Sequence, residues 1–120
     1  MNPENQEPLS KPDIVRLRHM NDACKRAIEI AQGVRVETLD PSSETALALT
    51  RLLEILGEAS KHVTPATQQL VPEIPWRLIA GLRNRIIHEY FNVDFEIVAS
   101  VIGNDLPELE AHLAHILMGR

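Results

Sequence analysis

Two arginines, an asparagine, a histidine and a tyrosine lie within one short segment, and together they suit chemistry on a phosphate. The segment reads Arg83-Asn84-Arg85-Ile86-Ile87-His88-Glu89-Tyr90-Phe91. A guanidinium binds phosphate oxygens and stabilises charge that develops on them, whereas an imidazole exchanges a proton near neutral pH. These groups suffice for metal-free RNA cleavage, because the 2′-hydroxyl of RNA supplies the nucleophile. DNA lacks this hydroxyl and is not an expected substrate.

The spacing within this segment predicts how its side chains are arranged on a helix. Asn84 and His88 are four residues apart and would share a face, so the Asn84 amide could orient the imidazole. Arg83 would lie about 140° away from His88 around the axis. It must therefore reach around the helix or act beside a second copy, which favours a homodimer. The approaching Asn92 indicates that the helix unwinds between His88 and Tyr90.

The same residues also have a purely structural interpretation. Arginine and histidine near the C-terminal end of a helix stabilise the helix dipole, and arginine and tyrosine are common at protein interfaces. The other histidines predict no second site: His19 and His62 are expected at helix surfaces, and His112 with His115 lacks a third metal ligand. No metal or cofactor is therefore predicted. Spacing alone leaves the catalytic and structural interpretations open.

Composition indicates one soluble domain with a local concentration of positive charge. The chain has 120 residues, a single cysteine, and a formal net charge of −5, which argues against a protein that coats nucleic acid. Three arginines and no acid nevertheless occur between residues 77 and 88, so Arg77 and Arg85 are candidate RNA contacts. The chain has neither a membrane-length apolar run nor a signal peptide, and a cytoplasmic location is expected.

Capping residues and apolar spacing predict the helices that precede this segment. Residues 1–9 are expected to form a disordered tail, and residues 10–120 a single helical domain. Ser10 is expected to cap a first helix that runs to Gly33. Asp40-Pro41 is expected to start a second helix, which ends near His62. Thr64-Pro65 then opens a short helix of about six residues.

Two further helices complete the expected fold. One runs from Pro75 to Ile87 and carries the polar segment on its last turns. The other follows a cap at Asp94 and continues to Leu117, with a kink or break before Pro107. No segment alternates convincingly with the period of a strand. The expected fold is an all-α up-and-down bundle of four main helices plus one short helix, which dimerises through the motif-bearing region.

The segment from Arg83 to Phe91 resembles the Arg-x4-His-x-Tyr motif of HepT-like toxins in the HEPN superfamily. The resemblance extends from about residue 12 to 118 and includes further short motifs in the same order, namely Arg18-His19-Met20, Asp22-Ala23, Gly57-Glu58-Ala59, Pro75-Trp76 and Asn104-Asp105-Leu106-Pro107. It implies a helical bundle that forms a dimer, with two copies of the motif facing each other across a cleft.

The resemblance also implies an activity and its control. Members of this family are metal-independent endoribonucleases; Arg83 and His88 match the catalytic pair, and Asn84 matches the polar residue after the arginine. A minimal nucleotidyltransferase antitoxin adds AMP to the motif tyrosine, here Tyr90. The expected function is thus an RNase toxin of a type VII-like toxin–antitoxin system, acting on tRNA or mRNA. The alternatives are a noncatalytic module that binds a nucleotide or the nucleotidyltransferase, and a purely structural helical dimer.

Overall fold

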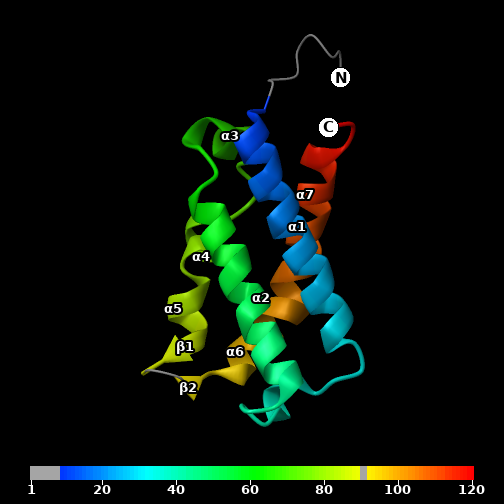
Figure 1. The fold of residues 1–120 in the computed structure, drawn as a ribbon, viewed down its shortest axis with the longest axis vertical. Helices are drawn as coiled ribbons and strands as arrows, with labels where there is room; N and C mark the ends of the chain where they lie inside the picture. Colours follow the sequence, from blue (N-terminus) through cyan, green and yellow to red (C-terminus); the bar gives the residue numbers. More distant parts are fainter. Residues whose placement is uncertain (1–8, 90–91) are drawn as a thin grey trace.

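Helices account for most of this protein, as a computed structural model of residues 9–89 and 92–120 shows (Figure 1). The two longest, α1 (Lys11–Ala31) and α2 (Glu44–Lys61), pack side by side, and α7 (Leu106–Leu117) packs against α1. The shorter helices are α3 (Pro65–Leu70), α4 (Trp76–Ala80), α5 (Leu82–Ile86) and α6 (Phe95–Ser100). The predicted all-α bundle is confirmed. None of the described helices is long and apolar enough to cross a membrane.

The beginnings of α1 and α2 show how far capping residues predict a helix. The Ser10 hydroxyl accepts a hydrogen bond from the Asp13 amide at 3.2 Å, as expected of a cap. The predicted start of α2 at Asp40-Pro41 is wrong. Asp40 instead accepts hydrogen bonds from the amide and hydroxyl of Ser42, which forms a local turn, and Ser43 caps the helix. Between α1 and α2 the chain forms one 3-10 turn, η2 (Val36–Thr38).

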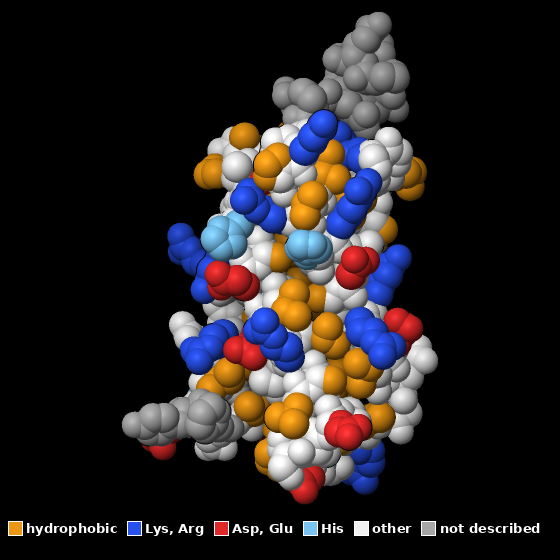
Figure 2. All heavy atoms as spheres, viewed as in Figure 1, with side chains coloured by type: hydrophobic (Ala, Val, Ile, Leu, Met, Phe, Trp, Pro, Cys, Tyr) orange, Lys and Arg blue, Asp and Glu red, His pale blue; other side chains and the backbone are white. Residues whose placement is uncertain are grey.

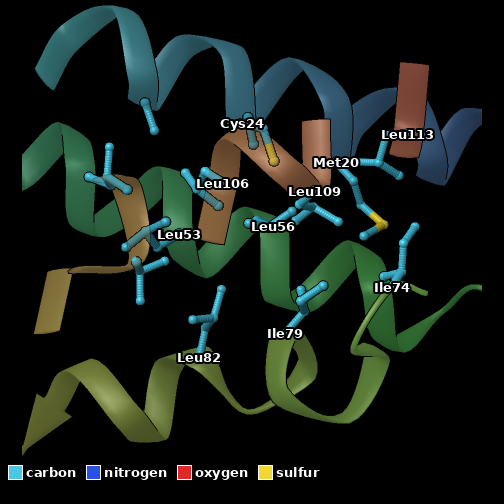
Figure 3. Packing of buried hydrophobic residues seen from close by; sticks show 14 of the residues in the cluster. Met20, Cys24, Leu53, Leu56, Ile74, Ile79, Leu82, Leu106, Leu109 and Leu113 are labelled. Atoms are coloured by element: carbon cyan, nitrogen blue, oxygen red, sulfur yellow. The ribbon is translucent and has the colours of Figure 1, made fainter. Parts of the chain in front are cut away.

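The hydrophobic core lies between α1, α2 and α7, and α4 and α5 close it on one side (Figure 3). Its largest fully buried aliphatic side chains come from every part of the chain and include Leu17, Met20, Leu49, Leu53, Leu56, Ile74, Ile86, Val98, Leu106 and Leu113. Cys24 is also buried, and burial raises the pKa of its thiol to about 12. The thiol is thus a small core side chain without a nucleophilic role.

A close approach between α2 and α4 sets the position of the helices that carry the polar segment. A Cβ atom on Gly57 would lie 2.9 Å from the carbonyl oxygen of Ile79, so only glycine lets the two backbones come this close. The predicted single helix from Pro75 to Ile87 is corrected: it is divided into α4 and α5 at Gly81. Glycine is a weak helix former, which accounts for the break at this position.

The chain between α5 and α7 departs most from a plain bundle. Strands β1 (Ile87–His88) and β2 (Asn92–Val93) form a small antiparallel sheet, with His88 opposite Asn92, which was not predicted. The expected break before Pro107 is present as a π-helical turn, η3 (Val101–Asp105). Pro107 has no amide hydrogen to donate, which favours an interruption there. The sheet lies at the end of the bundle opposite α3 (Figure 1).

Candidate active site

The motif helix α5 has one apolar face, which fixes it to the bundle, and one polar face. Leu82 and Ile86 are buried at a spacing of four residues and contact the core. Arg83 and Asn84 are exposed between them, and Arg85 is half-buried. The backbone of α5 is therefore held by its aliphatic residues, while its guanidiniums remain accessible to solvent.

Arg83 faces α2, where it has a carboxylate partner. Its Nε lies 3.5 Å from Oε2 of Glu54, and 62% of the Arg83 side chain is exposed. A pair this open to water contributes little to folding stability. The contact instead restricts the direction of the guanidinium and leaves its two terminal nitrogens free of other partners among the described residues. Those nitrogens are the pair that binds a phosphate bidentately.

Arg85 faces the opposite side of α5, towards the π-helical turn. Its Nη1 lies 4.0 Å from Oδ2 of Asp105, at the outer limit of an ion pair. The two side chains stand at one edge of a largely apolar groove of about 410 Å³ between α4, α5 and α7. Arg83 and Arg85 thus belong to different surfaces of α5, and an RNA strand bound at Arg83 would not automatically contact Arg85.

His88 lies just beyond α5, in β1, and its ring is paired with Asp94. The imidazole Nε2 lies 3.5 Å from Oδ2 of Asp94, and half of the His88 side chain is exposed. Asp94 also caps α6, because its Oδ1 accepts hydrogen bonds from the amides of Glu96 and Ile97. The turn is tight: Glu89 has a left-handed φ of 42°, and the Asp94 amide donates to the Ile86 carbonyl at 2.7 Å.

The expected pairing of Asn84 with His88 is absent. The helix ends at Ile86 and the chain continues extended at Ile87, so the four-residue helical relation is lost before His88. The Asn84 side chain is exposed and has no hydrogen bond within the described ranges 9–89 and 92–120. The predicted unwinding near His88 does occur, one residue earlier than the sequence indicated.

Of the other predicted site residues, one lies on the helix before the motif helix and one lies outside the described residues. Arg77 is exposed on α4, one helix before the motif, and its side chain has no ion pair with any described residue. Tyr90 lies outside the described residues. Among those described, no group of three or more histidine, cysteine or acidic side chains could hold a metal ion.

Three carboxylates that the sequence did not single out for the site adjoin its basic side chains. Glu54 comes from α2, Asp94 from the start of α6, and Asp105 from the π-helical turn. Asp94 had a sequence signal as a helix cap, and Asp105 lies in one of the short motifs of the family resemblance. Neither was predicted as a site residue, and the contact of Asp94 with His88 depends on the small sheet. The arrangement offers an anion-binding guanidinium and a histidine with an orienting carboxylate, both open to solvent.

Comparison with known proteins identifies the family of the chain. The sequence profile described as "HepT-like: Ribonuclease HepT-like" matches residues 20–116. A candidate RNase from Caldanaerobacter subterraneus subsp. tengcongensis is 36% identical over 84% of this chain and 90% of its own length. A protein from Thermococcus cleftensis named "Probable ribonuclease HepT" is 35% identical over 78% of this chain and 86% of its own length.

A relative of lower sequence identity also carries the name of an RNase. A candidate RNase from Methanocaldococcus jannaschii is 28% identical over 85% of this chain and 94% of its own length. No solved structure gives a significant match. The family profile covers the second half of α1, all of α2 and the whole segment from Arg83 to Asp94. The chain belongs to the HepT-like ribonuclease family.

Proposed function

We propose that this protein is a metal-independent endoribonuclease toxin in which Arg83 binds the scissile phosphate and His88 is the general base. The observation that carries the proposal is the exposure of both side chains on consecutive elements, each beside one carboxylate. Membership of a ribonuclease family supports it. Asn84, exposed beside Arg83, completes the proposed catalytic group as a hydrogen-bond donor to the substrate.

The proposed reaction uses only groups of the chain and of RNA. His88 accepts the proton of a 2′-hydroxyl, and the resulting oxygen attacks the adjacent phosphorus. The bond from phosphorus to the 5′-oxygen breaks, and that oxygen takes a proton to become a 5′-hydroxyl. Arg83 stabilises the charge on the non-bridging oxygens during this step. The products are a 2′,3′-cyclic phosphate end and a 5′-hydroxyl end.

Cleavage of tRNA and mRNA in EDTA tests the reaction. The wild-type protein is expected to produce 2′,3′-cyclic phosphate ends, and His88→Ala and Arg83→Ala are each expected to lose at least about 100-fold in rate. His115→Ala is the matched control, because His115 is exposed on α7, away from the motif and from the face formed by α1 and α2. Equal cleavage by all four proteins would reject the assignment. No cleavage by any of them would favour the noncatalytic nucleotide- or nucleotidyltransferase-binding module.

The proposed control of the activity is AMPylation of Tyr90 by a nucleotidyltransferase antitoxin. It rests on the family relationship and on the position of Tyr90 two residues after His88. An AMP group on this residue would add negative charge and bulk to the motif, so RNA phosphate would be repelled and excluded. Mass spectrometry of the protein coexpressed with a neighbouring nucleotidyltransferase should detect added AMP on Tyr90. Unmodified protein that is nevertheless inactive would contradict this control.

A homodimer is proposed to form on the face of α1 and α2 that adjoins Arg83. This face carries a stripe of hydrophobic side chains with basic and acidic side chains on both sides (Figure 2). Val15 of α1 is 48% exposed and lines a groove with Arg51 and Glu58 of α2. Leu47 is 59% exposed and lies one turn before Arg51 on α2. A hydrophobic centre with a charged rim is typical of a protein interface. Arg83 contacts Glu54 of α2 and thus lies beside the same face.

The charges along α2 fit a two-fold axis. Arg51 and Glu58 are exposed and lie seven residues apart on α2. If two copies of α2 cross antiparallel at the point midway between these residues, Arg51 of each subunit lies opposite Glu58 of the partner subunit. Such an isologous contact is self-complementary in charge. It would also bring the two copies of Arg83 to the borders of one shared surface.

Two leucines of nearly equal exposure give a matched test of the interface. Leu47 is 59% exposed on α2, and Leu78 is 57% exposed on α4. By sedimentation, Leu47→Glu is expected to be monomeric and Leu78→Glu dimeric. Arg51→Glu should also dissociate the dimer, and adding Glu58→Arg should restore it. The reverse result for the two leucines would move the interface to α4, and a monomeric wild-type protein at micromolar concentration would reject the dimer.

A further inference from the structure

We propose that Asp94 is a positioning residue that keeps the proton of neutral His88 on Nε2, so that Nδ1 is the atom that accepts the substrate proton. The inference rests on the proposed role of His88 as general base. It assigns a second task to a residue that the sequence identified only as a helix cap. The two tasks use different oxygens of one carboxylate.

The carboxylate of Asp94 is held in place by the start of α6. Its Oδ1 accepts hydrogen bonds from the backbone amides of Glu96 and Ile97, at 3.1 and 3.2 Å. The Asp94 amide donates to the Ile86 carbonyl at 2.7 Å, which fixes the backbone of the same residue to the end of α5. Because Oδ1 is occupied by the helix, Oδ2 is the oxygen that remains for the imidazole.

His88 is held against this oxygen by β1. Its backbone pairs with Asn92 across the small sheet, and its Nε2 lies 3.5 Å from Oδ2 of Asp94. The two atoms are at ion-pair distance, longer than a formed hydrogen bond, and this contact is proposed to shorten when substrate binds. An ionised carboxylate can only accept a hydrogen bond, so it selects the tautomer with hydrogen on Nε2. The lone pair is then left on Nδ1.

Replacing Asp94 by asparagine should reverse this choice without disturbing the helix. Asparagine caps helices as well as aspartate does, so α6 should remain intact. Its single carbonyl oxygen is needed by the amides of Glu96 and Ile97, and its NH₂ group would therefore face Nε2 of His88. A donor at this position favours hydrogen on Nδ1, which blocks the proposed base atom. The same reversal in a serine protease lowers kcat about 10⁴-fold.

Asp94→Ser is the matched control. Serine also caps the helix, but its one hydroxyl cannot serve α6 and His88 together. The imidazole of Asp94→Ser should exchange freely between tautomers, and kcat should fall about 10-fold, whereas Asp94→Asn should lose about 100-fold or more. KM and the melting temperature should change little in both. A merely structural role would give equal losses in the two variants, accompanied by lower melting temperatures.

Nitrogen-15 NMR of the full-length protein reads the tautomer directly, at about pH 8 where an ordinary histidine is neutral. His88→Ala identifies the His88 signals. Wild type is expected to carry hydrogen on Nε2, and Asp94→Asn on Nδ1. Hydrogen on Nδ1 in wild type, or no change in Asp94→Asn, would overturn the proposal. Since this measurement needs no substrate, it separates failure of the tautomer assignment from failure of the nuclease assignment.

Discussion

Asp13 and Asp94 lie at opposite ends of the bundle and use their carboxylates differently. Asp13, 1% exposed, accepts hydrogen bonds from the Thr64 amide, the Thr64 hydroxyl and the Thr67 hydroxyl, the last at 2.6 Å. It joins α1 to α3. The Asp94 side chain is one third exposed and leaves Oδ2 with a single contact at 3.5 Å. The first carboxylate is fully occupied within the fold, whereas the second can still adjust to a ligand.

The pKa of Asp13 reflects this occupancy. Burial alone would raise its pKa, but hydrogen bonds from Thr64 and Thr67 and the charge of Arg16 together hold it below the ordinary value. The ionised form is therefore the one that the fold stabilises. The Asp13 carboxylate, which joins two helices, is buried and fully hydrogen-bonded, whereas the groups proposed for catalysis are open and loosely paired. Stability and activity should consequently respond to different substitutions.

The largest effect on folding is expected from Asp13→Ala. The change removes the carboxylate that accepts from the Thr64 amide, the Thr64 hydroxyl and the buried Thr67 hydroxyl, and should lower the free energy of unfolding by about 3 kcal/mol. Urea unfolding measures it. Asp22→Ala, at an exposed position of the same helix, should change it by less than about 0.5 kcal/mol. If folded Asp13→Ala lost RNA cleavage, this would contradict the assignment of stability to the Asp13 end of the bundle and of activity to the Asp94 end.

Glu54→Gln should affect activity more than folding stability, the reverse of Asp13→Ala. Its contact with Arg83 is largely exposed, so the free energy of unfolding should change by less than about 1 kcal/mol. The guanidinium would lose its orienting charge, and kcat for RNA should fall about 10-fold, equivalent to about 1.4 kcal/mol. Glu29→Gln, exposed on α1, serves as the control. A large fall in melting temperature without a change in kcat would assign Glu54 to the fold.

The smallest expected effect is the acid dependence due to Asp13. Because its folded pKa is below the ordinary value of 3.8, its contribution to stability is complete above that value and is lost as pH falls through the lower, folded value. The stability difference between wild type and Asp13→Asn should therefore shrink on acidification below about pH 4. Unfolding by urea at several pH values measures it. A difference that stays constant to pH 2 would contradict the assigned pKa direction.

Local sequence signals predicted the helices and several of their ends. Ser10 and Asp94 cap helices as expected, because a cap depends on residues within three positions of it. Asp40-Pro41 carried the same signal, yet the turn formed by Ser42 moved the start of α2 to Glu44. The break at Gly81 was missed, since the apolar spacing continues across it.

Local capping and spacing signals could not predict contacts between segments that are distant in the sequence. Asp13 lies in the first turn of α1, but its partners are about fifty positions away in the chain, and their approach depends on how α3 folds back. The motif residues were identified by their types and spacing. Their carboxylate neighbours Glu54, Asp94 and Asp105 were not, because each is delivered by a different element. The two-residue strands were too short to show an alternating pattern.

Residues 87–93 leave and rejoin the bundle at almost the same point, since the Asp94 amide is hydrogen-bonded to the Ile86 carbonyl and Ile87 is paired with Val93. A segment closed at its base in this way can be exchanged as a unit. Grafting the corresponding segment of a relative between Ile86 and Asp94 should therefore leave the bundle folded, with a melting temperature close to that of the wild type. The bundle would then serve as a common frame for comparing family members one loop at a time.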